Sequence, residues 1–217
     1  MNKIFVFLMM IMANIITVKA TEAEKTIEVV IQTTKGDIEL SLYPGRAPVT
    51  VENFLENMKA GLYKNGKFYR ASRHDNNPGA KRKVLTLIQG GMDNGESDKK
   101  SPRPAIKHET TAQTGISHQN GVISMARNAP GTATTEFFIC IGDNSGLDYG
   151  TERYDVGQRQ GYATFGRVTK GMDVVIAIQQ SPTGAKVKND QDWFGRQVIN
   201  DLVEIKDIIL KQNAETK

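Results

Sequence analysis

Apolar and polar side chains alternate along residues 27–42, and the pair Lys35-Gly36 interrupts the alternation near its middle. A period of two places successive side chains on opposite faces of a strand, and a pair of this kind suits a tight turn between two strands. The segment therefore predicts a β-hairpin with one buried face.

The period changes to that of a helix in the next segment, where apolar residues recur at intervals of three and four. These residues are Val51, Phe54, Leu55 and Met58. Pro48 precedes them and Gly61 follows them, which is typical of the start and the end of a helix. A second, shorter helix is predicted over residues 172–179.

Six further short apolar runs are separated by stretches rich in Gly, Asn, Asp and Pro, and each run predicts a strand. They cover residues 67–71, 84–89, 121–125, 136–141, 162–168 and 202–210. With the hairpin they make eight strands, and a helix lies toward each end of the series. This order predicts a mainly β fold, a closed eight-stranded antiparallel barrel capped by two α-helices. Binding residues are expected beside the long connections 92–119 and 142–161.

The first twenty residues have the pattern of a secretory signal peptide. Lys3 precedes an apolar stretch over residues 4–18, and the segment ends on Val18-Lys19-Ala20. A membrane-spanning helix would need about 18 or more apolar residues, so cleavage after Ala20 is the favoured interpretation. We therefore expect a periplasmic protein that has no membrane attachment once the signal is removed. The expected division is a signal peptide at 1–20 and a single domain at 21–217.

Composition and motifs set several functions aside. The chain carries 28 Lys and Arg against 24 Asp and Glu, without a basic stripe interleaved with aromatics, so nucleic acid is not an expected partner. The three histidines lack metal-ligand spacing, and the sequence has no nucleophile elbow, phosphate-binding loop or dinucleotide fingerprint. We expect neither a metal nor a cofactor. The single cysteine, Cys140, is predicted to be a buried strand thiol.

Nine short motifs follow one another along residues 26–210. They are Gly36-Asp37-Ile38, Ala47-Pro48-x-Thr50-Val51-x-Asn53-Phe54, Phe68-Tyr69-Arg70, Ile88-Gln89-Gly90-Gly91, Ser124-Met125-Ala126-Arg127, Phe137-Phe138-Ile139, Gly146-Leu147-Asp148, Tyr162-Ala163-Thr164-Phe165-Gly166 and Gly171-Met172. In this order they resemble the cyclophilin family of peptidyl-prolyl cis-trans isomerases, or rotamases. Arg127 and Tyr162 resemble the choices of bacterial periplasmic members, whereas eukaryotic members usually carry histidine in place of Tyr162.

The resemblance implies a proline pocket on the outer face of the barrel, with Arg70 as the catalytic cation and Gln89 beside it. The residues implied to bind the substrate are Leu87, Ala126, Arg127, Glu136, Phe138, Leu147 and Tyr162. Phe138, Leu147 and Leu87 are implied to wall the pocket. Ala126 with Arg127 is implied to contact the substrate backbone.

The chemistry of the reaction agrees with an arginine in this place. Rotation about an X-Pro bond needs the amide twisted out of plane, against a barrier of about 18–20 kcal/mol. In the twisted form the proline nitrogen regains a lone pair, to which a fixed guanidinium donates better than to the planar amide. Phe137 and Phe138 must point to opposite faces of a strand, so one faces the barrel interior and the other a site.

Three positions depart from the family pattern. Residues 72–83 are an insertion where the family has a tight turn, and Thr86 falls where a pocket phenylalanine is expected, so Leu85 or Leu87 is expected to fill that space. Glu136 replaces a glutamine of the family. Its carboxylate can only accept hydrogen bonds, and we expect it at the pocket rim, within reach of an arginine.

The sequence thus predicts a monomeric peptidyl-prolyl cis-trans isomerase that accelerates X-Pro rotation in exported proteins and assists their folding. Its expected partners are proline-containing segments of unfolded or partly folded proteins. The alternative is a non-catalytic proline-binding or chaperone-like module on the same fold. Arg70 and the pocket favour the enzyme, whereas Thr86 and Glu136 favour the alternative.

Overall fold

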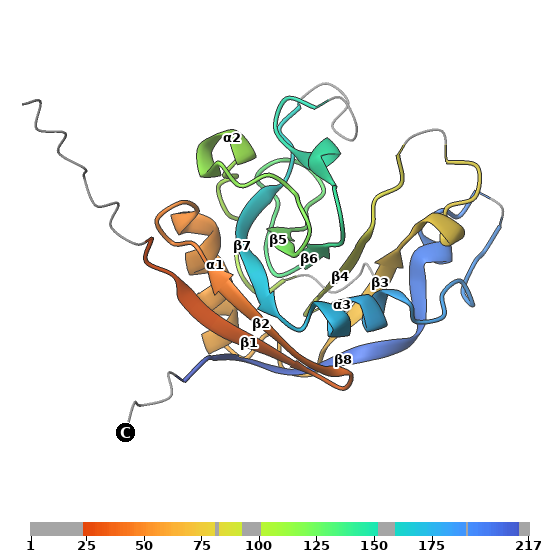
Figure 1. Ribbon diagram of the computed structural model, residues 1–217, viewed down its shortest axis with the longest axis horizontal. Helices are drawn as coiled ribbons and strands as arrows, with labels where there is room; N and C mark the ends of the chain where they lie inside the picture. Colours follow the sequence, from red (N-terminus) through yellow and green to blue (C-terminus); the bar gives the residue numbers. More distant parts are fainter. Residues whose placement is uncertain (1–23, 81–82, 93–100, 152–158, 190, 213–217) are drawn as a thin grey trace, which may run out of the picture.

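Eight strands close into one antiparallel barrel, as the sequence predicts (Figure 1). The computed structural model describes residues 24–80, 83–92, 101–151, 159–189 and 191–212, so the predicted signal peptide and its cleavage site lie outside the described residues. Around the barrel the strands follow the order β1-β2-β7-β5-β6-β4-β3-β8. Their bounds are β1 Ile27–Thr33, β2 Gly36–Leu42, β3 Gly66–Ser72, β4 Leu87–Gly91, β5 Val122–Met125, β6 Phe137–Cys140, β7 Ala163–Lys170 and β8 Val198–Leu210.

Two strands begin three or four residues from the predicted position, whereas the other strands begin within one residue of it. β4 begins at Leu87 rather than at residue 84, and the backbone N–H of Thr86 donates to Asn144 Oδ1 at 3.0 Å instead of to a strand. β8 begins at Val198 rather than at residue 202, because Val198 pairs with Arg70 of β3. Polar residues near the start of β8 conceal this pairing in the sequence.

The two predicted helices are α1, Pro48–Lys59, and α3, Met172–Gln179. α1 contacts β7, whereas α3 contacts β2, β3 and β4 (Figure 1). A third helix, the single turn α2 at Thr111–Thr114, lies in the long connection before β5 and was not predicted. Three short 3₁₀ turns complete the elements: η1 His74–Asn76, η2 Ser145–Leu147 and η3 Gly195–Gln197. Among the helices described, none has the length and hydropathy to cross a membrane.

A distant carboxylate closes the N-terminus of α1. The N-cap residue, Ala47, offers no side-chain hydrogen bond. Instead the buried Glu109, from the connection before α2, accepts from the backbone N–H groups of Val49 at 3.2 Å and Thr50 at 2.8 Å, and from the Thr50 hydroxyl at 2.6 Å. A carboxylate at this end satisfies unpaired donors and complements the helix dipole. Glu109 therefore ties the long connection to the first helix.

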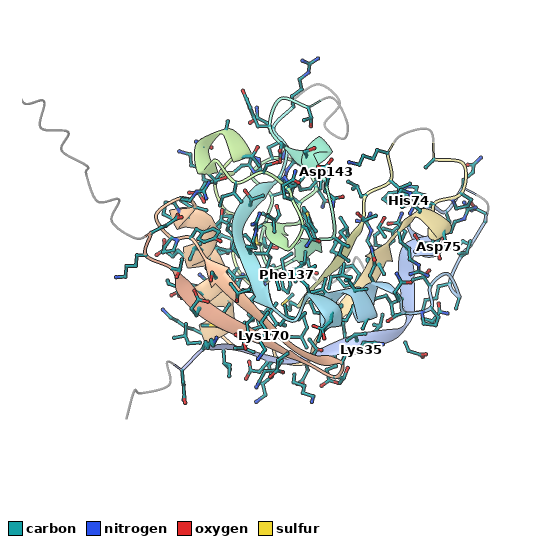
Figure 2. The ribbon with its side chains drawn as sticks, in the orientation of Figure 1. Lys35, His74, Asp75, Phe137, Asp143 and Lys170 are labelled. Carbon is teal, nitrogen blue, oxygen red and sulfur yellow. The ribbon has the colours of Figure 1, made fainter. Side chains whose placement is uncertain are left out.

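The interior of the barrel is built around Phe137. Its ring lies 5.7 Å from that of Phe54, 5.6 Å from Tyr63 and 5.8 Å from Phe68, each in an edge-to-face arrangement. Figure 2 shows Phe137 in the middle of the molecule. Its neighbour Phe138 belongs to a separate apolar cluster on the other face of β6, which confirms that the two rings point apart.

The Glu109 contacts generate a stability prediction. Replacing Glu109 with Gln removes the negative charge from three donors at the end of α1, and we expect the free energy of unfolding to fall by about 1–3 kcal/mol. Urea denaturation measures this difference. The matched control is Glu56→Gln on the same helix, where an exposed pair with Lys59 at 3.2 Å contributes little. Equal losses in the two variants would contradict a capping role for Glu109.

Candidate functional site

An irregularity in β3 brings two consecutive side chains to the outside of the barrel. The register against β4 shifts between Phe68, which pairs with Gly90, and Arg70, which pairs with Gln89. Such a β-bulge leaves one extra residue and redirects the side chains beside it. Phe68 remains in the barrel core, while the Tyr69 hydroxyl accepts a hydrogen bond from Gln89 Nε2 at 2.6 Å. Tyr69 and Arg70 thus both reach the outer side chain of Gln89.

The Arg70 guanidinium is held by two amide oxygens and two aromatic rings. Its Nε donates to Gln197 Oε1 and its Nη1 donates to Gln89 Oε1, both at 2.8 Å. Its central carbon lies 5.5 Å from the ring centroids of Trp193 and Phe194. A planar cation with fixed donors on two sides and rings against it has little freedom to rotate. Arg70 is therefore set in one orientation before any ligand arrives.

An apolar cavity of about 340 Å³ lies beside this arginine on the outer wall of the barrel. Leu87, Phe138, Cys140 and Leu147 form a buried cluster of their own, separate from the barrel core. Leu87, Phe138 and Leu147 of this cluster make the floor of the cavity. The structure brings eight of the nine predicted site residues to this cavity: Arg70, Leu87, Gln89, Ala126, Arg127, Phe138, Leu147 and Tyr162. Leu85 also lines it, as expected from the substitution at Thr86.

The ninth predicted residue, Glu136, is not among the residues that line this cavity. Its Oε1 accepts a hydrogen bond from the Thr135 hydroxyl at 3.3 Å. The carboxylate also packs on Gly91, where an added Cβ would lie 2.6 Å from Oε1. These contacts direct Glu136 toward the end of β4, so a role in substrate binding rests on the family resemblance alone.

Arg127 and Tyr162 form one unit at the rim. The Arg127 guanidinium lies 4.6 Å from the centroid of the Tyr162 ring, and its Nε donates to the carbonyl of Gly161 at 3.0 Å. The tyrosine ring in turn meets Phe138 edge-on, with centroids 5.6 Å apart. Arg127 therefore supports the ring that closes one side of the cavity.

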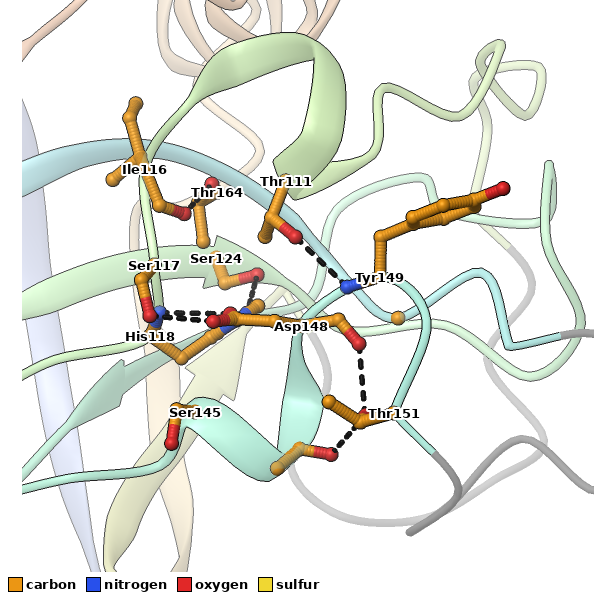
Figure 3. A network of polar contacts seen from close by, with 12 residues as sticks. Thr111, Ile116, Ser117, His118, Ser124, Ser145, Asp148, Tyr149, Thr151 and Thr164 are labelled. Carbon is orange, nitrogen blue, oxygen red and sulfur yellow. Dashed lines mark hydrogen bonds and ion pairs between the residues drawn. The ribbon is translucent and has the colours of Figure 1, made fainter.

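A polar network lies behind the cavity floor (Figure 3). The buried His118 ring stacks on Phe138 at 5.8 Å, and its Nδ1 lies 2.6 Å from Asp148 Oδ1. Its Nε2 lies 3.0 Å from the hydroxyl of Ser124 on β5. The hydroxyl of Ser117 donates to Asp148 Oδ2 at 2.5 Å. Because Asp148 follows Leu147 directly, the network fixes two walls of the cavity from behind.

The charge of this network follows from its burial. Burial lowers the pKa of His118 and outweighs the opposing hydrogen bond and charge of Asp148. Burial by itself raises the pKa of Asp148, but hydrogen bonds from His118 and Ser117 outweigh burial and hold that pKa below its usual value. The ring is thus neutral beside a carboxylate, with Nδ1 donating to Asp148 and Nε2 accepting from Ser124.

Several residues at this site were not found from the sequence. Trp193 and Phe194 line the cavity, Gln197 holds Arg70, and His118 supports Phe138. One signal was available for the first pair, because Trp193 is the single tryptophan of the chain and stands in a polar stretch. Within the described part of the chain, no group of three or more His, Cys, Asp or Glu could hold a metal ion.

A closed barrel whose outer wall carries an apolar cavity beside a fixed arginine defines the cyclophilin-like class of fold. The family model for the cyclophilin type peptidyl-prolyl cis-trans isomerase matches residues 28–200. A crystal structure of a Cryptosporidium parvum cyclophilin type isomerase shares this fold, with a TM-score of 0.66 and 22% identity over 87% of this chain and 99% of that one.

Curated bacterial relatives agree with the family model. Peptidyl-prolyl cis-trans isomerase A of Dickeya dadantii is 36% identical over 76% of this chain and 77% of its own length. Peptidyl-prolyl cis-trans isomerase B of Escherichia coli is 35% identical over 72% of this chain and 86% of its own length. The chain belongs to the cyclophilin-type peptidyl-prolyl cis-trans isomerase family, and it is an isomerase.

The buried His118 generates a pH prediction. The unfolded chain protonates this histidine near pH 6.5, whereas the folded protein takes up the proton only at lower pH. The unfolded state therefore binds more protons in this window, and the free energy of unfolding falls as the pH drops from about 7.5 to 5.5. His118→Asn removes this contribution, so its stability changes less over the same range. Urea denaturation at several pH values, referenced to pH 8 for each protein, checks this; an unchanged pH dependence in the variant contradicts it.

Proposed function

We propose that this isomerase acts outside the cytoplasm, in the periplasm, on proline-containing segments of unfolded or partly folded exported proteins. We assign Arg70 and Gln89 as its catalytic residues. The single observation that carries the assignment is the Arg70 guanidinium, held by Gln197 and Gln89 at the edge of the cavity on the outer wall of the barrel. An apolar recess next to a fixed donor suits a proline whose nitrogen accepts a hydrogen bond.

The proposed step is a rotation without covalent chemistry. Twisting the X-Pro amide breaks its conjugation and leaves a lone pair on the proline nitrogen. Arg70 then donates to that nitrogen more strongly than to the planar amide, which stabilises the transition state over the ground state. Gln89 fixes the donor, because its Oε1 accepts from Arg70 while its Nε2 donates to Tyr69 at 2.6 Å.

The arginine cannot account for the whole acceleration. One charge-assisted hydrogen bond contributes about 1.5–3 kcal/mol, whereas a 10⁵-fold acceleration requires about 7 kcal/mol. In the proposal the pocket supplies the rest of the stabilisation of the transition state. Phe138, Leu147 and Leu87 grip the proline ring and exclude water, which strengthens the hydrogen bond from Arg70. Ala126 and Arg127 contact the substrate backbone, and Tyr162, which Arg127 supports, closes one side of the pocket.

Arg70 gives the direct test of this assignment. We expect Arg70→Ala to lower kcat/KM by at least about tenfold, because it removes a donor that acts mainly in the twisted state. Arg70→Lys is expected to be nearly as damaging, since an ammonium cannot hold two amide oxygens in a plane. A protease-coupled assay on a proline tetrapeptide measures both, and urea denaturation checks that the variants fold.

The matched control is Arg167→Ala, which removes an exposed arginine on β7 away from the cavity. It should leave turnover unchanged. If Arg70→Ala keeps full activity, Arg70 is a surface cation without a catalytic role. If the wild type binds the peptide and does not accelerate its isomerisation, the chain is a proline-binding module.

Export is proposed from the pattern of residues 1–20. We expect the secreted form to begin at Thr21, because a signal peptidase cleaves after the small residue at the end of Val18-Lys19-Ala20. Mass spectrometry of the N-terminus in a periplasmic extract gives the answer. A chain that still begins at Met1 and sediments with the membrane would show that the segment is an anchor.

A further inference from the structure

A second cavity, of about 410 Å³, shares part of its lining with the first. Its lining residues are Arg70, Ser72, Asn77, Ala80, Lys83, Val84, Leu85, Tyr162, Trp193 and Gln197. Four of them, Arg70, Leu85, Tyr162 and Trp193, line the first cavity as well. The two cavities therefore meet at a shared wall, and a bound chain can occupy both.

One wall of the second cavity is the insertion after β3, and it is anchored at several points. Asn76 Nδ2 donates to the carbonyl of Ala71 at 2.8 Å and to the Thr183 hydroxyl at 3.2 Å. Arg73 Nη1 donates to the carbonyl of Gln179 at 2.7 Å. Figure 1 shows η1 beside the segment that leads into β8. The described part of the insertion is thus a built wall, fixed to the chain that follows α3.

The same wall is linked to Arg70 through the side chain of Gln197. Gln197 Nε2 donates to Asn77 Oδ1 at 2.6 Å, while Gln197 Oε1 accepts from Arg70 Nε at 2.8 Å. A single amide therefore joins the insertion to Arg70. The position of Asn77 in the second cavity is therefore linked to that of the guanidinium.

Trp193 gives the second cavity an aromatic surface. The Trp193 side chain is 60% exposed, which leaves much of a large ring uncovered. The Trp193 ring meets the Phe194 ring edge-on, with centroids 5.7 Å apart, and the Arg70 guanidinium carbon lies 5.5 Å from the Trp193 centroid. These two contacts hold the indole in place. Val84 and Leu85 add aliphatic surface beside it. A held, open indole next to aliphatic side chains suits a flat apolar group.

The charges of the lining residues favour an aromatic group over an aliphatic one. Arg70 and Lys83 are its ionised members, and among the described lining residues none is a carboxylate. Lys83 already forms an ion pair with Asp143. The face of an aromatic ring carries negative charge density and is attracted to cations, whereas an aliphatic side chain is not.

We propose that the second cavity is a subsite for an aromatic side chain of the substrate, placed one or two residues from the proline. An extended chain advances about 3.3–3.6 Å per residue, so a side chain that close to the ring in the first cavity can reach across the shared wall. The subsite rests on the proposed function, because it takes the first cavity as the proline site. It gives the isomerase a preference among X-Pro segments.

The experiment compares alanine peptides that contain one central proline. Phenylalanine replaces alanine in turn at each of the two positions on either side of the proline, and kcat/KM is measured for every peptide. We expect one position to gain about fivefold or more over alanine, the size of one aromatic contact. In Trp193→Leu, which keeps apolar bulk without a ring, the ratio of phenylalanine to alanine falls to near one. Trp193→Phe retains most of the preference, and Ile176→Ala on α3 retains all of it.

Binding is measured separately from turnover. Trp193 is the single tryptophan of the chain, so its fluorescence reports on the wall that the two cavities share, without a signal from another tryptophan. The favoured phenylalanine peptide should shift or quench the emission at lower concentration than the alanine peptide does. This signal tests the subsite even if the peptide is not isomerised, so failure of the subsite and failure of the proposed activity are distinguishable.

Three results would overturn the subsite. The first is a series in which phenylalanine gives no gain at any of the four positions. The second is a gain that persists in Trp193→Leu, because the preference then comes from another part of the surface. The third is an equal gain from aspartate at the favoured position, which would identify a cationic site for acidic substrates.

Discussion

The functional site of this molecule depends on how one guanidinium, that of Arg70, is held. Arg70 lies at the surface of a barrel, yet it is held between amides contributed by Gln89 and Gln197, residues far apart in the chain. A long cationic side chain keeps a single orientation only when several hydrogen bonds and ring contacts act together. The stabilisation from each contact alone is offset by the loss of side-chain entropy. The β-bulge in β3, the start of β4 and the turn before β8 all have to be in place for the site to exist.

The two faces of the barrel wall have different roles: the inner face packs the core and the outer face carries the site. Phe137 packs into the interior with Phe54, Tyr63 and Phe68, while Phe138 faces the cavity and rests on His118. Adjacent residues of one short strand thus serve the core and the site. A closed sheet has no free edge and deforms little, so the cavity on its outside has a stable shape before the substrate binds. Preorganisation of this kind is what a rotation without covalent intermediates requires.

Local pattern was enough to predict the hairpin, α1, α3 and the opposed directions of Phe137 and Phe138, since periods of two and 3.6 report directly on which face is buried. The start of β8 was missed because Val198 is placed by its pairing with Arg70, a contact that no local pattern encodes. The same holds for the partners of Arg70 and Phe138. Gln197 contacts Arg70, and His118 contacts Phe138, only because the barrel closes. A single glutamine or histidine in a sequence does not indicate which residue it will contact.

In the proposed function, the insertion after β3 changes the specificity while the reaction stays the same. Loop length costs little free energy, so extra residues at the end of a strand pair are tolerated and can be shaped without disturbing the barrel. Here Asn77 of the insertion accepts a hydrogen bond from Gln197, which accepts one from Arg70, so a change in the insertion also acts on the orientation of the proposed catalytic cation. If the proposed function and subsite hold, a wall that both shapes a neighbouring cavity and orients the arginine couples the choice of substrate to the rate of its rotation.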